Sequence, residues 1–216
     1  MNKKLLFYLG FFIVLIIGFY FFAFNGTDIL SKSSLDKRGF VQPFSFPNQD
    51  GIAFTNADMQ GKVCVVNYFF TSCKGICPKM NFNMKKIYDE FKDNPDFIIV
   101  SHSCDPDNDS VPKMKHYSDS LKVDNKKWVF LTGRKDSLYK MARFSYGIDD
   151  PKNVVADIKD DFIHTQFFAL IDKNGKVRGG VYDGLKDNEI EKLKIDIKSL
   201  LKEKAMKGNF ANGIFN

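Results

Sequence analysis

The stretch NYFFTSCKGICPKMNFNM, residues 67–84, joins two kinds of sequence at a pair of cysteines. Residues 62–70, KVCVVNYFF, are a continuous β-branched and aromatic run, which predicts a strand buried on both faces. After Pro78, apolar residues recur at helical spacing, and proline is favoured in the first helical turn. Cys73 and Cys77 therefore lie between the carboxyl end of a strand and the start of a helix, the edge where open α/β sheets bind ligands.

The segments around this stretch alternate between strand and helix patterns. A short Pro-bounded hairpin is predicted before it, over residues 41–54, with a turn at Asp50–Gly51. A second hairpin is predicted over residues 164–183, with a turn at Asn174–Gly175. Further strands are predicted at 96–103 and 128–133, and further helices at 112–122, 136–146 and 187–205. This order predicts an α/β domain with a mixed central sheet and helices on both faces.

The N-terminal segment predicts a membrane anchor. From Leu5 to Phe24 every residue is apolar, aromatic or Gly, and about 20 such residues at helical rise span a bilayer core of roughly 30 Å. A cleaved signal peptide is the alternative, although its apolar region is normally about 7–15 residues long. We expect a single-pass transmembrane anchor at 1–24, a linker at 25–40, a domain at 41–204 on the outer (periplasmic or equivalent) face, and a tail at 205–216.

Composition excludes several classes of function. The chain carries 32 Lys and Arg against 26 Asp and Glu, a formal net charge of +6. The basic surplus is scattered and lacks interleaved stacking aromatics, so we interpret it as solvated surface and expect no nucleic-acid partner. The 4 cysteines are too few for a disulfide scaffold in 216 residues. They indicate that some of the cysteines form a functional site and that the others have no part in it.

The spacing of Cys73 and Cys77 permits both redox and metal chemistry. Free N–H groups at a helix start favour thiolates, which serve either purpose. A disulfide needs Cβ atoms about 3.5–4.5 Å apart, whereas helical residues at i and i+4 keep them about 5–6 Å apart. A metal bound about 2.3 Å from each sulfur tolerates the larger gap, and soft thiolates select copper(I), zinc or iron–sulfur clusters. Gly75 allows the loop to close, so a disulfide stays open as an alternative.

A metal held by two sulfurs needs a further ligand, and the chain has 3 histidines. His164 begins a predicted strand and can face the cysteine loop across the sheet edge; the alternative is a surface histidine at a strand start. His116 falls in a charged helix and is expected to be exposed, and His102 lies within the strand predicted at 96–103.

Four segments together resemble the Sco/SenC family of copper chaperones: GKVCVVNYFFTSCKGICPKM (61–80), SCDPDNDSVPKMKHY (103–117), WVFLTG (128–133) and HTQFFALIDKNGKV (164–177). The resemblance covers roughly residues 41–204 and the N-terminal anchor. It implies a membrane-anchored, thioredoxin-like domain that binds a copper ion and serves assembly of the dinuclear copper (CuA) site of cytochrome c oxidase. The implied partners are the copper-bearing subunit of the oxidase or its assembly factors.

The resemblance also assigns residues. The family's copper ligands match Cys73, Cys77 and His164, and its D-P-x-x-D segment matches Asp105, Pro106 and Asp109. Asp105 is expected either to orient His164 or to cap the turn that follows it.

Other residues near the motif depart from the family or have plainer interpretations. Cys104 stands where an apolar residue is common, and it is either a small buried hydrophobe or an additional thiol near the site. Asn108 replaces a frequent Arg. Cys64 is expected to be packing, and Met80 and Met84 to be core residues rather than thioether ligands.

Three functions are weighed on these residues. The first is a copper chaperone, not a classical enzyme, that holds copper(I) and passes it on by ligand exchange. The second is a thiol–disulfide oxidoreductase acting on client cysteines. Against it, thioredoxin-type enzymes have a cis-proline facing the cysteine pair, and none of the 7 prolines lies beyond Pro151. The third, a peroxide-handling enzyme, is disfavoured because TSCKGICP lacks an Arg-supported pattern and Arg143 is interpreted as an ordinary helix residue.

Overall fold

A computed structural model describes residues 3–25, 33–153, 157–158, 160–163 and 165–205, with the backbone alone at 21–25. The chain divides into two compact units, Met1–Lys32 and Ser33–Asn216. The first contains helix α1 (Lys3–Asn25), whose window Lys3–Tyr20 has a mean hydropathy of 1.8 and no buried share. By length and composition α1 is able to cross a membrane; a signal sequence passes the same test, so anchoring stays a prediction.

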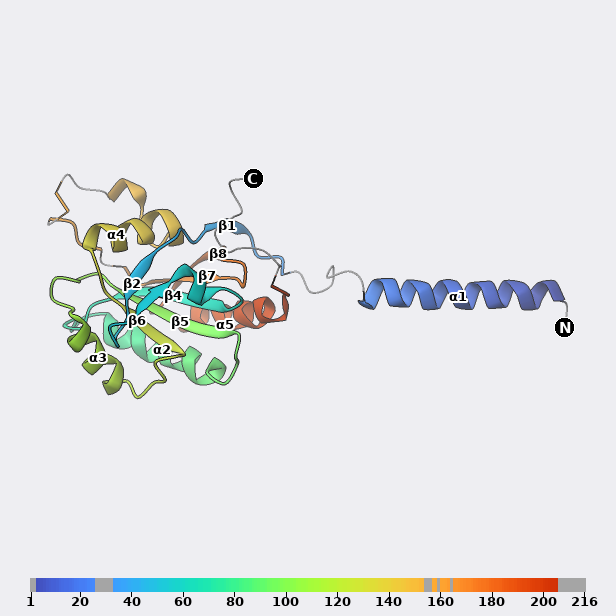
Figure 1. Ribbon diagram of the computed structural model, residues 1–216, viewed down its shortest axis with the longest axis horizontal. Helices are drawn as coiled ribbons and strands as arrows, with labels where there is room; N and C mark the ends of the chain where they lie inside the picture. Colours follow the sequence, from blue (N-terminus) through green and yellow to red (C-terminus); the bar gives the residue numbers. More distant parts are fainter. Residues whose placement is uncertain (1–2, 26–32, 154–156, 159, 164, 206–216) are drawn as a thin grey trace. The chain divides into compact units, whose positions relative to one another are not determined.

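A six-stranded mixed sheet forms the framework of the second unit, with strand order β1-β8-β7-β4-β5-β6 (Figure 1). Strand β4 pairs parallel with β5 and antiparallel with β7, and β5 pairs parallel with β6. The strands are β1 (Lys37–Phe40), β4 (Val63–Phe69), β5 (Phe97–Ser103), β6 (Trp128–Leu131), β7 (Phe167–Ile171) and β8 (Lys176–Asp183). A separate antiparallel hairpin, β2 (Ser45–Pro47) and β3 (Ala53–Thr55), matches the hairpin predicted over residues 41–54.

Helices cover both faces of this sheet because the central strands are apolar on both sides. In β4, Cys64 and Val66 belong to the hydrophobic core on the face covered by α4. Val63 and Val65 belong to the core on the opposite face, which α2 and α5 cover. Figure 1 shows α4 and α2 on opposite sides of the sheet. The helices are α2 (Cys77–Phe91), α3 (Val111–Ser120), α4 (Lys135–Lys140) and α5 (Asp187–Lys202), with short η2 (Asn56–Met59) and η4 (Pro151–Asn153). The predicted α/β fold with a mixed central sheet is confirmed.

Three details differ from the sequence prediction. Residues 37–40, assigned to the linker, form edge strand β1 against β8; their charged composition hides a strand that is largely exposed. The helix predicted at 136–146 changes after Lys140 into a π-helix, η3 (Met141–Tyr146). Strand β7 begins at Phe167, three residues later than predicted.

Buried Arg178 joins the first segment of this unit to the last. Its Nη1 donates to Asp172 Oδ2 (2.8 Å) and Glu203 Oε2 (3.0 Å), and its Nη2 donates to the Ser33 carbonyl (3.3 Å). Its Nε donates to the Leu35 carbonyl (3.2 Å), and the Ser33 N–H donates to Glu203 (2.8 Å). The side chains of Arg178 and Asp172 are only 3% and 2% exposed, so both charges are compensated within the protein; Glu203 also pairs with Arg178, and the N–H groups of Asn174 and Lys176 also donate to Asp172.

Replacing Arg178 with Ala is expected to lower the free energy of unfolding by about 3–5 kcal/mol, because the buried carboxylate of Asp172 loses its ion-pair partner. Arg134→Ala is the matched control: Arg134 is 80% exposed in its pair with Asp136, and its loss is expected to leave the free energy of unfolding almost unchanged. Urea unfolding of the purified full chain measures both values. Equal, small losses in the two variants would show that Arg178 does not hold the unit together.

Candidate thiol and metal site

Cys73 and Cys77 lie where β4 has ended and α2 begins. Helix α2 starts at Cys77 itself, with Ile76 as its N-cap and Pro78 in its first turn. Cys77 is 4% exposed and belongs to the core beneath α2, whereas Cys73 is half-buried and packs only against the edge of that core. All four cysteines are free thiols. The loop therefore offers one thiol to solvent and keeps the other inside.

The two thiols share a hydrogen bond and differ in acidity. Burial favours the neutral form of Cys73, but hydrogen bonds from the Cys77 thiol and from the N–H groups of Gly75, Ile76 and Cys77 outweigh it and lower the pKa of Cys73. Burial, together with the bond to Cys73, raises the pKa of Cys77 to about 12. Cys73 is thus the thiol that ionises first, and Cys77 holds its proton and donates it to the Cys73 sulfur.

The buried carboxylate of Asp109 fastens the cysteine loop to the end of β5. It accepts hydrogen bonds from the Thr71 N–H (3.2 Å), the Thr71 hydroxyl (2.5 Å) and the Ser103 hydroxyl (2.6 Å). Asp109 is 0% exposed, so its charge is compensated by these donors alone among the contacts described. From the sequence, Asp109 could be matched to a motif but could not be given a role. The residue that indicates its role is Thr71, two residues before Cys73, because it donates to the Asp109 carboxylate.

Asp105 makes the contacts of a turn cap. Its carboxylate accepts hydrogen bonds from Asn108 Nδ2 (3.1 and 3.0 Å), and its N–H donates to the Ser103 hydroxyl (3.0 Å). These are the contacts that the turn-capping alternative predicts, while the alternative that Asp105 orients His164 stays a prediction.

Cys104 is packed between the sheet and its neighbours. It is 2% exposed, and its thiol donates to the Phe69 carbonyl (3.3 Å). Burial raises its pKa above the ordinary range, and the nearby Cys77 adds to the effect. This environment fits a small buried hydrophobe better than an additional reactive thiol.

His164 lies outside the described residues, but the residues around it are placed. The ring of Phe162 meets the ring of Phe70 edge-on, with centroids 5.4 Å apart. The Ile163 N–H donates to the Tyr139 hydroxyl (3.3 Å), which itself donates to the Cys104 carbonyl (2.6 Å). Residue 162 therefore contacts the segment that carries Cys73, and residue 163 is linked to Cys104 through Tyr139.

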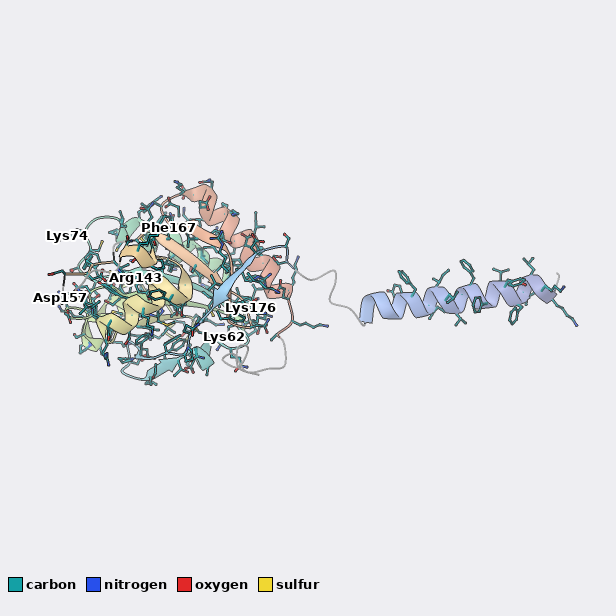
Figure 2. The ribbon with its side chains drawn as sticks, turned by 90° about the horizontal axis from the view of Figure 1, so that it is seen from above. Lys62, Lys74, Arg143, Asp157, Phe167 and Lys176 are labelled. Carbon is teal, nitrogen blue, oxygen red and sulfur yellow. The ribbon has the colours of Figure 1, made fainter. Side chains whose placement is uncertain are left out.

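Figure 2 agrees with this grouping. Lys74, from the cysteine loop, and Asp157, from the segment before β7, lie toward one end of the domain, and Lys62 and Lys176 lie toward the other (Figure 2). The carboxyl end of β4 and the segment that leads to His164 thus share one end of the sheet.

The part of the chain that the structure describes contains no group of three or more His, Cys, Asp or Glu residues able to hold a metal ion. Cys73 and Cys77 therefore supply two ligands at most, and a third must come from beyond the described residues or from a partner. The two methionines considered as possible thioether ligands are not available to a metal. Met80 and Met84 are core residues at 1% and 0% exposure, as predicted.

The two remaining histidines differ in environment. His102 is fully buried, stacks on Tyr68 with centroids 5.1 Å apart, and has Nε2 3.1 Å from the Tyr146 hydroxyl. Burial lowers the pKa of His102 to about 3, so the ring stays neutral. His116 is exposed on α3, as predicted. Neither ring joins the two thiols in a cluster that could hold a metal.

Known proteins resemble this chain over most of its length. A family model described as SCO1/SenC matches residues 32–202. The SCO1 protein homolog of Bacillus subtilis is 31% identical over 163 residues, which span 74% of this chain and 81% of that protein.

Solved structures share the fold. BsSco, described as a member of the Sco family of cytochrome c oxidase assembly proteins with a disulfide switch, is 30% identical at a TM-score of 0.63 and covers 78% of this chain and 98% of its own. Copper-bound ScoI of Bradyrhizobium japonicum, 24% identical, has a TM-score of 0.58 over 76% of this chain and 100% of its own. The thioredoxin-like fold predicted from the sequence is confirmed.

Iodoacetamide is expected to modify Cys73 before the other three cysteines. The lowered pKa of Cys73 makes its thiolate available below the usual thiol pKa of about 8.5, so its rate should reach half-maximum at a lower pH than that of a free cysteine. Peptide mass spectrometry of timed samples from about pH 5 to about pH 9 measures the four rates. In the denatured chain the four rates should converge, and faster labelling of Cys77 or Cys104 in the folded chain would contradict the assignment.

Proposed function

The chain belongs to the SCO1/SenC family, and from this premise we propose that it is a copper chaperone that serves cytochrome c oxidase assembly. Copper is held by the sulfurs of Cys73 and Cys77 and by the imidazole of His164. It is passed to the copper-bearing oxidase subunit or to an assembly factor at the CuA site. The relatives support this proposal, because BsSco is described as an oxidase assembly protein and ScoI was solved with copper bound.

The observation that carries the proposal is the contact between the two segments that bear the ligands. Phe162, two residues before His164, packs on Phe70, three residues before Cys73. Two thiolates and one imidazole form a soft donor set, which suits copper(I). The described residues offer no competing cluster of ligands, so a site completed by His164 is the one that the chain's own chemistry favours.

The difference between the thiols gives the site its chemistry. Copper(I) takes the place of protons on sulfur, so binding releases the proton of Cys77, whose pKa is raised, and affinity increases with pH. Half-buried Cys73 is the ligand that an incoming client thiolate reaches first. Transfer then proceeds by exchange of one thiolate ligand for another at the copper ion, with no change in its charge.

We propose α1 as a single transmembrane anchor, with the domain on the outer (periplasmic or equivalent) face. The hydropathy and length of α1 support the anchor. The linker is then shorter than residues 25–40, because residues 37–40 belong to the sheet.

Thiol–disulfide exchange is a second candidate, favoured by the hydrogen bond between Cys73 and Cys77 and by the lowered pKa of Cys73. In this reaction the Cys73 thiolate attacks a client disulfide and releases one client thiolate. The Cys77 sulfur then attacks Cys73, which frees the second client thiolate and leaves a Cys73–Cys77 disulfide. The client gains two electrons and the chain loses two. The disulfide switch for which BsSco is described supports this alternative.

Copper(I) affinity of the full chain in detergent tests the chaperone proposal, measured by competition with a chromogenic chelator under reducing conditions. His164→Ala is expected to weaken binding by at least about tenfold, because even residues that merely orient a ligand cost about 10–100-fold when removed. Cys73→Ser and Cys77→Ser are expected to abolish retention of copper. His116→Ala, an exposed histidine on α3, is the matched control and should bind like the parent; unchanged affinity in His164→Ala would refute the assignment.

The redox candidate is tested on the copper-free chain in glutathione buffers of graded potential. The pair Cys73–Cys77 is expected to interconvert reversibly between dithiol and disulfide with a two-electron slope, about 30 mV per tenfold change in the equilibrium constant. Buried Cys64 and Cys104 should stay reduced, which mass tagging of free thiols reveals. Rapid reduction of insulin by the same sample would rank this reaction above copper transfer.

A further inference from the structure

Arg143 is buried in η3, and its described hydrogen bonds all go to one stretch of chain, although the sequence alone predicts an ordinary helix residue. Its Nε donates to Asp149 Oδ2 (2.7 Å), and its Nη1 and Nη2 form a fork on Asp161 at 2.7 and 2.9 Å. Nη2 also donates to the Asn153 carbonyl at 3.4 Å. The side chains of Arg143 and Asp161 are 4% and 5% exposed, and Arg143 is labelled in Figure 2.

The partners of Arg143 belong to the segment that leads to His164. Asp149 stands near the beginning of that segment and Asp161 three residues before His164. The next two residues are held by other elements: Phe162 by Phe70 of the cysteine loop, and Ile163 by Tyr139 of α4. Each of the three residues before His164 is thus fixed to a different part of the domain.

This segment has little regular structure to fix its path. Between Gly147 and Phe167, the described residues contain only the short helix η4, so side-chain contacts must take the place of a helix or sheet ladder. Burying a guanidinium and two carboxylates is costly, and an apolar contact would hold two segments together at least as well. What the planar fork adds is direction, because a bidentate pair fixes both the distance and the orientation of Asp161.

We propose that Arg143 is a positioning residue for the copper ligand His164, an inference that rests on the proposed function. Through Asp161, Arg143 holds the end of the segment against the cysteine loop before copper arrives. Copper binding then does not have to order the segment. The entropy cost of that ordering would otherwise reduce the affinity for copper. Arg143 touches neither copper nor thiol in this role and acts only through the backbone between residues 161 and 164.

Copper(I) binding by the full chain in detergent tests this role with four variants. Arg143→Gln removes the charge and the fork, Arg143→Lys keeps the charge but loses the fork, and Asp161→Asn removes the partner. Arg134→Gln, at an exposed pair with Asp136, is the matched control. Copper(I) itself is the probe, and folding of each variant is checked by far-ultraviolet circular dichroism.

Arg143→Gln is expected to weaken copper(I) binding about tenfold, the order found for residues that orient a metal ligand. Adding His164→Ala to Arg143→Gln should cost little more, because the imidazole is already displaced; this non-additivity is the readout that a purely structural role does not produce. The alkylation rate of Cys73 in Arg143→Gln, and in its combination with His164→Ala, should equal that of the parent chain.

The outcomes separate this inference from the proposed function. If His164→Ala weakens copper binding but Arg143→Gln does not, or if the two losses simply add, Arg143 has no positioning role and the copper site stands. If His164→Ala binds like the parent, the proposed ligand set fails and this inference fails with it. Should Arg143→Gln not fold, Arg143→Lys and Asp161→Asn replace it, and parental affinity in both overturns the proposal.

Discussion

A single buried carboxylate determines what the thiol end of this domain looks like. Strands β4 and β5 run parallel, so both deliver their chain to the same edge of the sheet. A loop there lacks ladder partners, and Asp109 supplies them by accepting hydrogen bonds from Thr71 and Ser103. A buried charge without such donors would be strongly unfavourable, so the carboxylate and the loop stabilise each other. In the loop fastened in this way Cys73 is half-buried, whereas Cys77 is buried in the core beneath α2.

The same two sulfurs suit metal binding and electron exchange, because both processes begin with a thiolate. What separates the two is the third participant. An imidazole aimed at the loop completes a metal site, whereas a client disulfide completes a redox site. The extra residue between Cys73 and Cys77 does not decide, since the thiols of this loop lie close enough to share a hydrogen bond without being joined. The segment before β7 is therefore the part of the chain on which the choice of chemistry depends.

Local patterns in the sequence were sufficient to predict the central strands, the helix after the cysteine pair and the last hairpin. The apolar run in β4, the helical repeat after Pro78 and the Asn174–Gly175 turn each carry their information within a few residues, and the structure agrees with them. Edge strand β1 was missed because an exposed strand shows no apolar alternation. The change from α- to π-helix after Lys140 was missed because no local residue type signals it.

The candidate site likewise has features that the sequence reveals and features that depend on the folded structure. Cys73 and Cys77 are recognisable from their spacing, but the order of their pKa values depends on burial and on hydrogen bonds that only the folded loop creates. The partners of Arg143 at positions 149 and 161 are brought together by tertiary structure alone, so no local pattern reveals them. Buried Arg178 has one further consequence. It ties the incoming segment at Ser33 to the outgoing one at Glu203, near the level of the sheet where β4 begins. The described ends of this unit are consequently held near the start of β4, whereas Cys73 lies beyond the carboxyl end of the same strand, so a partner that approaches Cys73 meets neither of those two ends.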